Sequence, residues 1–270
     1  MLTQSLPSTP PRRDPLRIQR AVLLALVVRE LRSRVEGRWL SLLWLIFEPL
    51  THVLLILALI GVRSNVVMLN VELPVFLVTG LLPFFLFRNL ARKLPSSIGA
   101  NRSLFAYRQV MPLDALTARA IVEVGLYSVV YVAALLVLGW MGYHSVPRAP
   151  LELAVVGVVL VAFGMGLGLL FAILQHNRPK VTTFIGFVFL PLYFASGVIF
   201  QLHNLAPEIR DWLLYNPVLH LVELSRVYFI PNYTALPGVT LEYPAAWALV
   251  VTALALGLYR IYRHRFLLVS

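Results

Sequence analysis

The chain has 270 residues, of which 59% are hydrophobic and only 13% are charged, and its mean hydropathy is +0.81. Because a soluble domain is typically about 25% charged, this composition excludes a soluble enzyme. A membrane-spanning helix needs roughly 20 apolar residues, so the chain has room for several spans. The net charge of +11 must then be concentrated outside them.

The N-terminal part of the chain is polar and basic. Residues 1–15 contain four prolines and several polar groups, which is typical of a disordered tail. Residues 16–38 contain an apolar run behind arginines that superficially resembles a signal peptide. This run is too short to span a membrane, charged residues follow it at once, and no small-residue cleavage site is present. We therefore expect residues 16–38 to form an amphipathic helix on the cytoplasmic membrane surface.

Six apolar stretches are each long enough to cross a hydrocarbon core of about 30 Å, some of them with tilt. They are residues 39–62, 73–90, 121–142, 151–174, 181–200 and 247–262. In lipid, the backbone polar groups must be bonded within their own segment, so these stretches are predicted to be helices. The predicted fold class is an all-α integral membrane protein, with six transmembrane helices in residues 39–270.

The basic residues are unevenly distributed between the two predicted sides of the membrane. Most of the 23 Lys and Arg residues precede the first span, follow the second or the fourth, or lie at the C-terminus. Because basic loops are retained in the cytoplasm, this distribution predicts that both termini are cytoplasmic.

Polar residues inside the spans are candidates for a channel lining. Glu48 is a carboxylate in the first span, with Trp44 one turn before it and His52 one turn after it on the same face. A proton relay between Glu48 and His52 is possible in principle, but a structural hydrogen-bonded pair is favoured, and a polar pore lining is compatible with both.

The third span has a second candidate face, because Glu123, Tyr127 and Tyr131 recur every four residues. Tyrosine rings with polar edges suit the passage of sugars, although ordinary helix packing or interfacial anchoring gives the same pattern. Three aromatic residues of the fifth span are expected to pack in the core instead: Phe184, Phe187 and Phe194.

Residues 202–231 are apolar but contain too many polar groups for a span that faces lipid. A further crossing would also place the basic C-terminus outside. We therefore expect re-entrant helices that enter the membrane part-way from the outer side and act as a gate. The candidate gate residues are Asn216, Pro217, His220, Glu223 and Arg226. The last three lie loosely on one helix face. Two interpretations of this face are open: an internal salt bridge, or a contact with another protein.

Several kinds of chemistry are missing from the sequence. There is no cysteine, and the six histidines fall in different segments without metal-ligand spacing, so neither a metal site nor a catalytic residue is predicted. The two lysines, Lys93 and Lys180, are followed by Leu and Val, whereas a phosphate-binding loop needs Gly-Lys before Ser or Thr. If the function consumes ATP, another polypeptide must bind it.

Five segments resemble one known family in their order and spacing. They read LWLIFEP at 43–49, PVFL at 74–77, GLLPFF at 80–85, NRSLFAYR at 101–108 and NPVLHLVELSR at 216–226. The chain resembles, from about Val28 to its C-terminus, the inner-membrane permease subunit of bacterial ABC transporters that export capsular polysaccharide.

The resemblance implies a homodimer that pairs with two copies of a separate ATPase, which binds ATP and Mg²⁺. Such a complex moves a lipid-linked, usually acidic, polysaccharide across the inner membrane to the periplasm, where adaptor and outer-membrane proteins carry it onward. It involves no nucleic acid. The outer gate segment would then be periplasmic.

The resemblance also gives a role to residues 94–118, the longest predicted cytoplasmic loop, with a short helix around Ser97 to Tyr107. It would contain a coupling helix that sits in a groove of the ATPase. The candidate coupling residues are Ser97, Asn101, Phe105, Tyr107 and Arg108. The alternative is a surface helix resting on lipid headgroups.

Two other functions remain as alternatives. An ion-coupled secondary transporter would use Glu48 and His52 as its proton site, but no internal repeat is visible between the halves of the sequence. A membrane protein that modifies lipid-linked sugars would need a cluster of acidic or histidine residues at a membrane face, and the sequence has none.

Overall fold

The computed structural model of the chain describes residues 14–35, 47, 51–56, 58, 71–178 and 180–268. Within these ranges every regular element is a helix, and no strand is present. Residues 1–13 of the tail predicted at 1–15, and most of the predicted first span, including Trp44 and Glu48, lie outside the described residues. The described part of that span is helical at 51–56, which includes His52.

In the part of the chain that the structure describes, four helices are long and apolar enough to cross a membrane. They are α3 (Leu73–Ala100), α4 (Pro112–Trp140), α5 (Pro150–Asn177) and α9 (Glu242–Leu268), whose qualifying part is Glu242–Arg263. A fifth apolar helix, α6 (Val181–Ala195), is shorter. Proline stands in the first turn of α3, α4 and α5, where its missing N–H costs no helical hydrogen bond.

Several helix ends differ from the ends of the predicted spans, and two of the differences have a clear physical reason. α3 continues past residue 90 to Ala100, because its last turns are still buried and Leu94 packs in one cluster with Leu116 of α4 and Leu169 of α5. The connection predicted at 94–118 is therefore mostly helical, and only a short 3-10 helix, η1 (Arg102–Ala106), separates α3 from α4. α6 stops at Ala195 instead of residue 200, because Gly197 follows with a positive φ of 61°.

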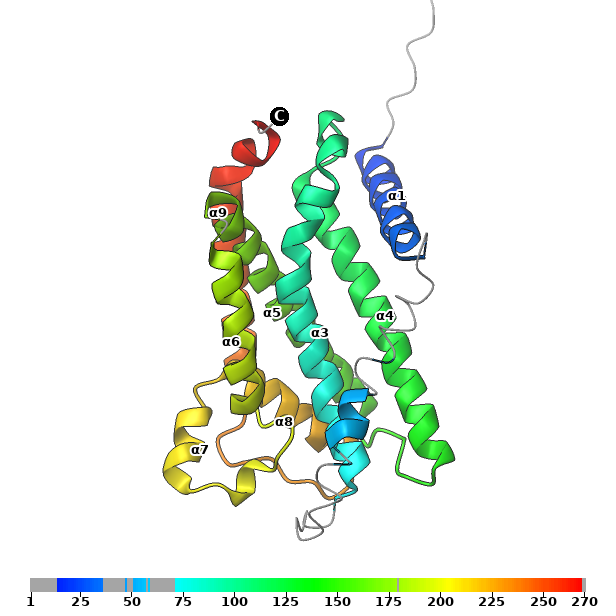
Figure 1. The fold of residues 1–270 in the computed structure, drawn as a ribbon, viewed down its shortest axis with the longest axis vertical. Helices are drawn as coiled ribbons and strands as arrows, with labels where there is room; N and C mark the ends of the chain where they lie inside the picture. The colour runs from blue at the N-terminus through cyan, green and yellow to red at the C-terminus, as the bar shows by residue number, and fades with distance from the viewer. Residues whose placement is uncertain are drawn as a thin grey trace, which may run out of the picture.

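α3 lies at the centre of the bundle and packs against α4, α5 and α8 (Figure 1). Glycines on α5 allow the closest approaches: a Cβ at Gly168 would lie 2.8 Å from the Leu90 carbonyl oxygen of α3, and one at Gly166 would lie 3.1 Å from the Thr252 nitrogen of α9. The small-residue stripe of α5 therefore contacts a neighbour on two sides, as such stripes do in membrane helix packing.

α1 (Pro15–Val35) lies beside one end of α4, close to the end of α3 (Figure 1). Two contacts join it to that end: Gln19 Nε2 donates to Asp114 Oδ1 at 2.6 Å, and Arg29 Nη1 donates to Asn101 Oδ1 at 2.9 Å. The helix is less amphipathic than expected, because its buried residues include both Leu26 and Glu30.

Three short helices gather at the opposite end of the bundle from α1 and the C-terminus (Figure 1). They are η2 (Leu202–Asn204), α7 (Pro207–Leu213) and α8 (Pro217–Phe229). α8 is packed against α3 and α5 and buries most of its residues, whereas α7 buries none. The segment predicted as a gate thus consists of one buried helix and one exposed helix.

Candidate functional site

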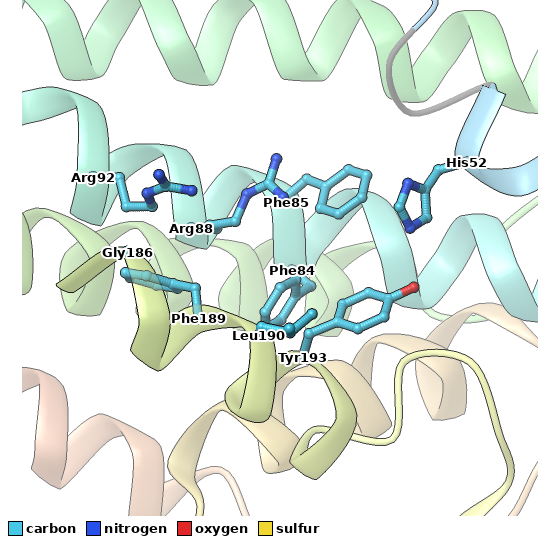
Figure 2. A pocket seen from close by; sticks show the side chains of 9 residues that line it. All are labelled: His52, Phe84, Phe85, Arg88, Arg92, Gly186, Phe189, Leu190 and Tyr193. Atoms are coloured by element: carbon cyan, nitrogen blue, oxygen red, sulfur yellow. The ribbon is translucent and has the colours of Figure 1, made fainter. Parts of the chain in front are cut away.

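A cleft opens between α3, α6 and the helical residues 51–56. It has a volume of about 230 Å³. Figure 2 shows the side chains that line it: His52, Phe84, Phe85, Arg88, Arg92, Gly186, Phe189, Leu190 and Tyr193. The α3 and α6 members recur at three- or four-residue intervals, so each helix presents one face to the cleft.

Aromatic rings form the wall of the cleft. The Tyr193 ring centroid lies 5.3 Å from that of Phe84 and 5.9 Å from that of His52, both edge to face. His52 also meets Phe85 edge to face at 5.4 Å. Aromatic faces of this kind bind the apolar faces of sugar rings, while the Tyr and His edges offer polar groups.

Two arginines of α3 bring positive charge to the same cleft. The Arg88 Cζ lies 4.4 Å from the centroid of the Phe85 ring, and the Arg92 Cζ lies 6.0 Å from that of Phe189. Guanidinium groups stack in this way on aromatic faces. The cleft therefore combines aromatic surfaces with positively charged groups.

The outer face of α6 is strongly apolar and is not covered by the chain itself. Phe184 is 69% exposed and Phe187 is 72% exposed, and Phe194 is also exposed. The expectation that these three residues pack in the core was wrong for the single chain, because α6 packs only lightly against α3 and α5.

The candidate channel face of α4 lies away from this cleft. Glu123 is fully buried, and its Oε1 lies 2.7 Å from Arg34 Nη2 of α1 and 3.9 Å from Lys93 Nζ of α3. Tyr127 is also buried and accepts a hydrogen bond from Asn89 Nδ2 at 2.6 Å. Tyr131 lines a separate, largely apolar crevice of about 410 Å³ between α3, α4, α5 and α8. The three residues share a face, but that face packs within the subunit.

The most buried charged cluster in the described residues lies on α8. Arg226 is fully buried and donates through Nη1 to the Gly197 carbonyl at 2.8 Å and through Nη2 to the Val198 carbonyl at 2.7 Å. Its Cζ lies 3.6 Å from the Phe76 ring centroid of α3. The side chain thus joins α8 to α3 and to the turn after α6.

Glu223 completes this cluster. It is fully buried, its Oε2 lies 3.5 Å from Arg226 Nη1, and its Oε1 accepts a hydrogen bond from Tyr233 Oη at 2.8 Å. A Cβ at Gly80 would clash with the Arg226 guanidinium, so only glycine fits beside it. The sequence leaves two interpretations open for the face of His220, Glu223 and Arg226: an internal salt bridge or a contact with another protein. The internal ion pair is the one observed, because neither charged group is accessible to another protein.

The other candidate gate residues hold α8 at its N-terminus. Asn216 caps the helix by accepting from Val218 N at 3.0 Å, and its Nδ2 donates to Ser196 Oγ at 2.9 Å. Pro217 occupies the first turn. His220 Nδ1 accepts from Thr240 N at 3.0 Å, and its Nε2 lies 2.9 Å from the Leu214 carbonyl. The exposed aromatic residues of this region, Trp212 and Tyr215, are instead on and just after α7.

The candidate coupling residues divide into two groups. Ser97 and Asn101 are buried, and Asn101 Nδ2 donates to the Ser97 carbonyl at 2.8 Å, so both stabilise the end of α3. Phe105 is half-buried on η1, whereas Tyr107 and Arg108 are exposed. Only the last two residues are free to contact another protein.

Six residues of the cleft were missed as functional candidates in the sequence: Phe84, Phe85, Arg88, Arg92, Phe189 and Tyr193. The two arginines had been counted only for orientation. Their four-residue spacing within an apolar helix, shortly after Phe84 and Phe85, is the available signal. Among the described residues, no group of three His, Asp or Glu side chains could hold a metal ion.

Comparison with known proteins assigns the chain to a family. The sequence profile of the ABC-2 type transporter family matches residues 21–230, from α1 through the end of α8, and so includes both the cleft and the Arg226 cluster. The chain belongs to the ABC-2 type transporter family. The membership agrees with the apolar helices of the bundle.

Several ABC-2 relatives are similar over most of their length. The polysialic acid transport protein KpsM of Escherichia coli is 35% identical over 248 residues, which cover 92% of this chain and 96% of KpsM. The capsule polysaccharide export inner-membrane protein CtrC of Neisseria meningitidis serogroup B is 29% identical over 252 residues, 91% of each chain. The protein of the same description from Haemophilus influenzae, BexB, is 28% identical over 217 residues, 79% of this chain and 81% of BexB.

Proposed function

We propose that the chain is the pore-forming permease subunit of an ATP-driven exporter, which moves lipid-linked capsular polysaccharide from the cytoplasm across the bacterial inner membrane. The observation that supports this most directly is the cleft of Figure 2, which carries aromatic rings and two arginines on an ABC-2 family member. The relatives named for capsule polysaccharide export and polysialic acid transport support the substrate class.

The pore requires a second copy of the chain. α6 exposes Phe184, Phe187 and Phe194. In a lone subunit these side chains would face only lipid. In a homodimer, the α6 faces and clefts of two copies would enclose one pore. We propose six spans per copy: the four long helices, α6, and the predicted span at 39–62. Both termini would lie in the cytoplasm, with α1 at the membrane surface beside them.

ATP would be bound by two copies of a separate ATPase, together with Mg²⁺, because this chain has no nucleotide-binding loop. The exposed Tyr107 and Arg108 are the residues proposed to contact it. α7 and α8 would lie at the periplasmic end, where α8 forms the gate. The periplasmic adaptor would approach there and pass the polymer to outer-membrane proteins.

Reconstitution tests this function. The chain and its proposed partner ATPase are placed together in liposomes, and movement of lipid-linked polysaccharide across the bilayer is measured. We expect movement only with ATP and with an ATPase competent for hydrolysis. Movement driven by an imposed pH gradient without ATP would contradict the proposal and favour an ion-coupled transporter, and chemical alteration of the sugar without movement would favour a modifying protein.

A further inference from the structure

We propose that the crevice between α3, α4, α5 and α8 binds one acyl chain of a membrane phospholipid, and that Arg148 at the mouth of the crevice binds the phosphate group of that lipid. The inference goes beyond the proposed function and does not depend on it. It requires only that the chain lies in a membrane, which its family and its apolar helices support.

The crevice is a gap between α4 and α5. Both helices pack along α3 but scarcely against each other, and a space of about 410 Å³ remains between them. On the α5 side, a Cβ at Gly157 would meet no atom of a neighbouring element within 4 Å. The space in front of this glycine is therefore open and can accommodate a ligand.

The lining suits a hydrocarbon chain. It includes Leu82 and Leu86 of α3, Val132 of α4, and Leu153 and Leu160 of α5, and none of the described residues that line it is charged. Val132 is 56% exposed, so the crevice opens to the surroundings of the bundle, which in a membrane are lipid. Apolar walls gain dispersion contacts from a chain and little from water. A lipid chain is therefore the occupant that the walls favour.

Two tyrosines of α4 lie on the wall of the crevice. The Tyr127 hydroxyl accepts the hydrogen bond from Asn89. The Tyr131 hydroxyl is buried and has no hydrogen-bond partner in the described part of the chain, while its ring meets the Phe229 ring edge to face at 6.4 Å. An acyl chain packs against this ring without bonding the hydroxyl, whereas a polar ligand would bond it. Tyr131 thus distinguishes the two kinds of occupant.

The mouth of the crevice carries a positive charge. Arg148 is exposed and stands between Pro147 and Pro150, which both line the crevice. Its backbone N–H donates to the Phe229 carbonyl at 3.3 Å, which holds this segment at the C-terminal end of α8. Guanidinium groups bind phosphate oxygens through charge-assisted hydrogen bonds. An apolar crevice with a cation at its mouth is complementary to the two parts of a phospholipid.

Native mass spectrometry of the full-length chain in a mild detergent tests the site. The probes are phosphatidylglycerol and a diacylglycerol with the same two acyl chains. Gly157→Leu fills the crevice, and its control is Gly257→Leu, at an equally open glycine of α9. Arg148→Gln removes the cation at the mouth, and its control is Arg102→Gln, at an exposed arginine of η1. Unchanged gel-filtration profiles and unfolding midpoints establish that each variant is folded.

We expect Gly157→Leu to weaken binding of both probes about tenfold, because the chain loses its contacts with the walls. Arg148→Gln should weaken phosphatidylglycerol about fivefold and leave the diacylglycerol unchanged, since only the first probe carries a phosphate. Neither control should weaken either probe. Tyr131→Phe keeps the ring and should bind both probes as the unmodified chain does.

Three results would overturn the inference. Equal binding of both probes by Gly157→Leu and Gly257→Leu would show that the crevice holds no acyl chain. Weaker binding by Tyr131→Phe would show that a polar group of the ligand bonds the hydroxyl. Conversion of a dimer to a monomer by Gly157→Leu, with lipid binding unchanged, would assign the crevice to a contact between two copies of the chain.

The phosphate contact is tested separately from the chain site. Equal binding of phosphatidylglycerol by Arg148→Gln and Arg102→Gln would show that Arg148 does not bind the phosphate. None of these outcomes bears on the proposed function, which depends on ATP-driven export and is measured by reconstitution.

Discussion

Replacing Arg226 with methionine is expected to destabilise the folded chain by about 3–5 kcal/mol. The substitution keeps much of the side-chain volume but removes the donors to the Gly197 and Val198 carbonyls. It also leaves the fully buried Glu223 without its ion-pair partner. The midpoint of thermal unfolding of the purified protein in detergent, followed by tryptophan fluorescence, measures the loss.

Three further variants separate this explanation from a general sensitivity to mutation. Arg148→Met, at an exposed arginine on the same end of the bundle, should shift the midpoint little. Adding Glu223→Gln to Arg226→Met should recover part of the loss, because the uncompensated buried charge is removed. Arg226→Lys should not restore the full midpoint, since one ammonium group cannot reproduce the two planar contacts. An Arg226→Met midpoint equal to that of the unmodified chain would show that the cluster does not hold α8.

The second large effect is expected at the junction of α1 with the bundle. Replacing Arg34 with alanine removes the contact of 2.7 Å to Glu123 and leaves that fully buried carboxylate with Lys93 at 3.9 Å. We expect a loss of about 1.5–3 kcal/mol, typical of a hydrogen bond to a charged group and discounted because Arg34 is partly exposed. The same change should loosen α1, which can be detected as faster amide hydrogen exchange in residues 15–35.

A double-mutant cycle of Arg34→Ala and Glu123→Gln isolates this contact. The two changes should be non-additive, because each removes the same interaction. Arg34 also lies 3.4 Å from Glu30, so a parallel cycle with Glu30→Gln is the matched control and should show a smaller coupling energy. Additivity of Arg34→Ala and Glu123→Gln within about 0.3–0.5 kcal/mol would exclude the pair as the link between α1 and α4.

The sequence predicts the kind of fold well, and its limits have a physical origin. Apolar length predicts membrane helices because lipid leaves no alternative to internal backbone bonding, and α4 and α5 contain the stretches expected at 121–142 and 151–174 almost completely. Helix ends are less predictable, because they depend on neighbours: Leu94 near the end of α3 packs in one cluster with Leu116 of α4 and Leu169 of α5, and this packing is invisible in the sequence.

A shared helix face can be predicted from the sequence, whereas the neighbours of that face cannot. The four-residue spacing of Glu123, Tyr127 and Tyr131 predicts one shared face, yet it does not indicate that α1 supplies an arginine to cover Glu123. Similarly, Arg88 and Arg92 belong to the basic residues that predict orientation. Residues that set topology can also line a cavity, and the sequence does not distinguish the two roles. Periodicity predicts helices but not the family of the chain, which the resemblance predicts. The match to the ABC-2 type transporter family over residues 21–230 confirms the family.

The central claim is that the polysaccharide passes through the cleft between α3 and α6, and the absence of native cysteine allows a direct measurement. Leu190→Cys places one thiol in the cleft, and Leu136→Cys places one on α4 outside it, at positions where the leucines are 65% and 70% exposed. Each complex is reacted to completion with a bulky maleimide and assayed for ATP-driven export in liposomes. We predict that modification at position 190 blocks export while modification at position 136 leaves the rate unchanged. Export at the unmodified rate through a complex fully labelled at position 190 would contradict the claim.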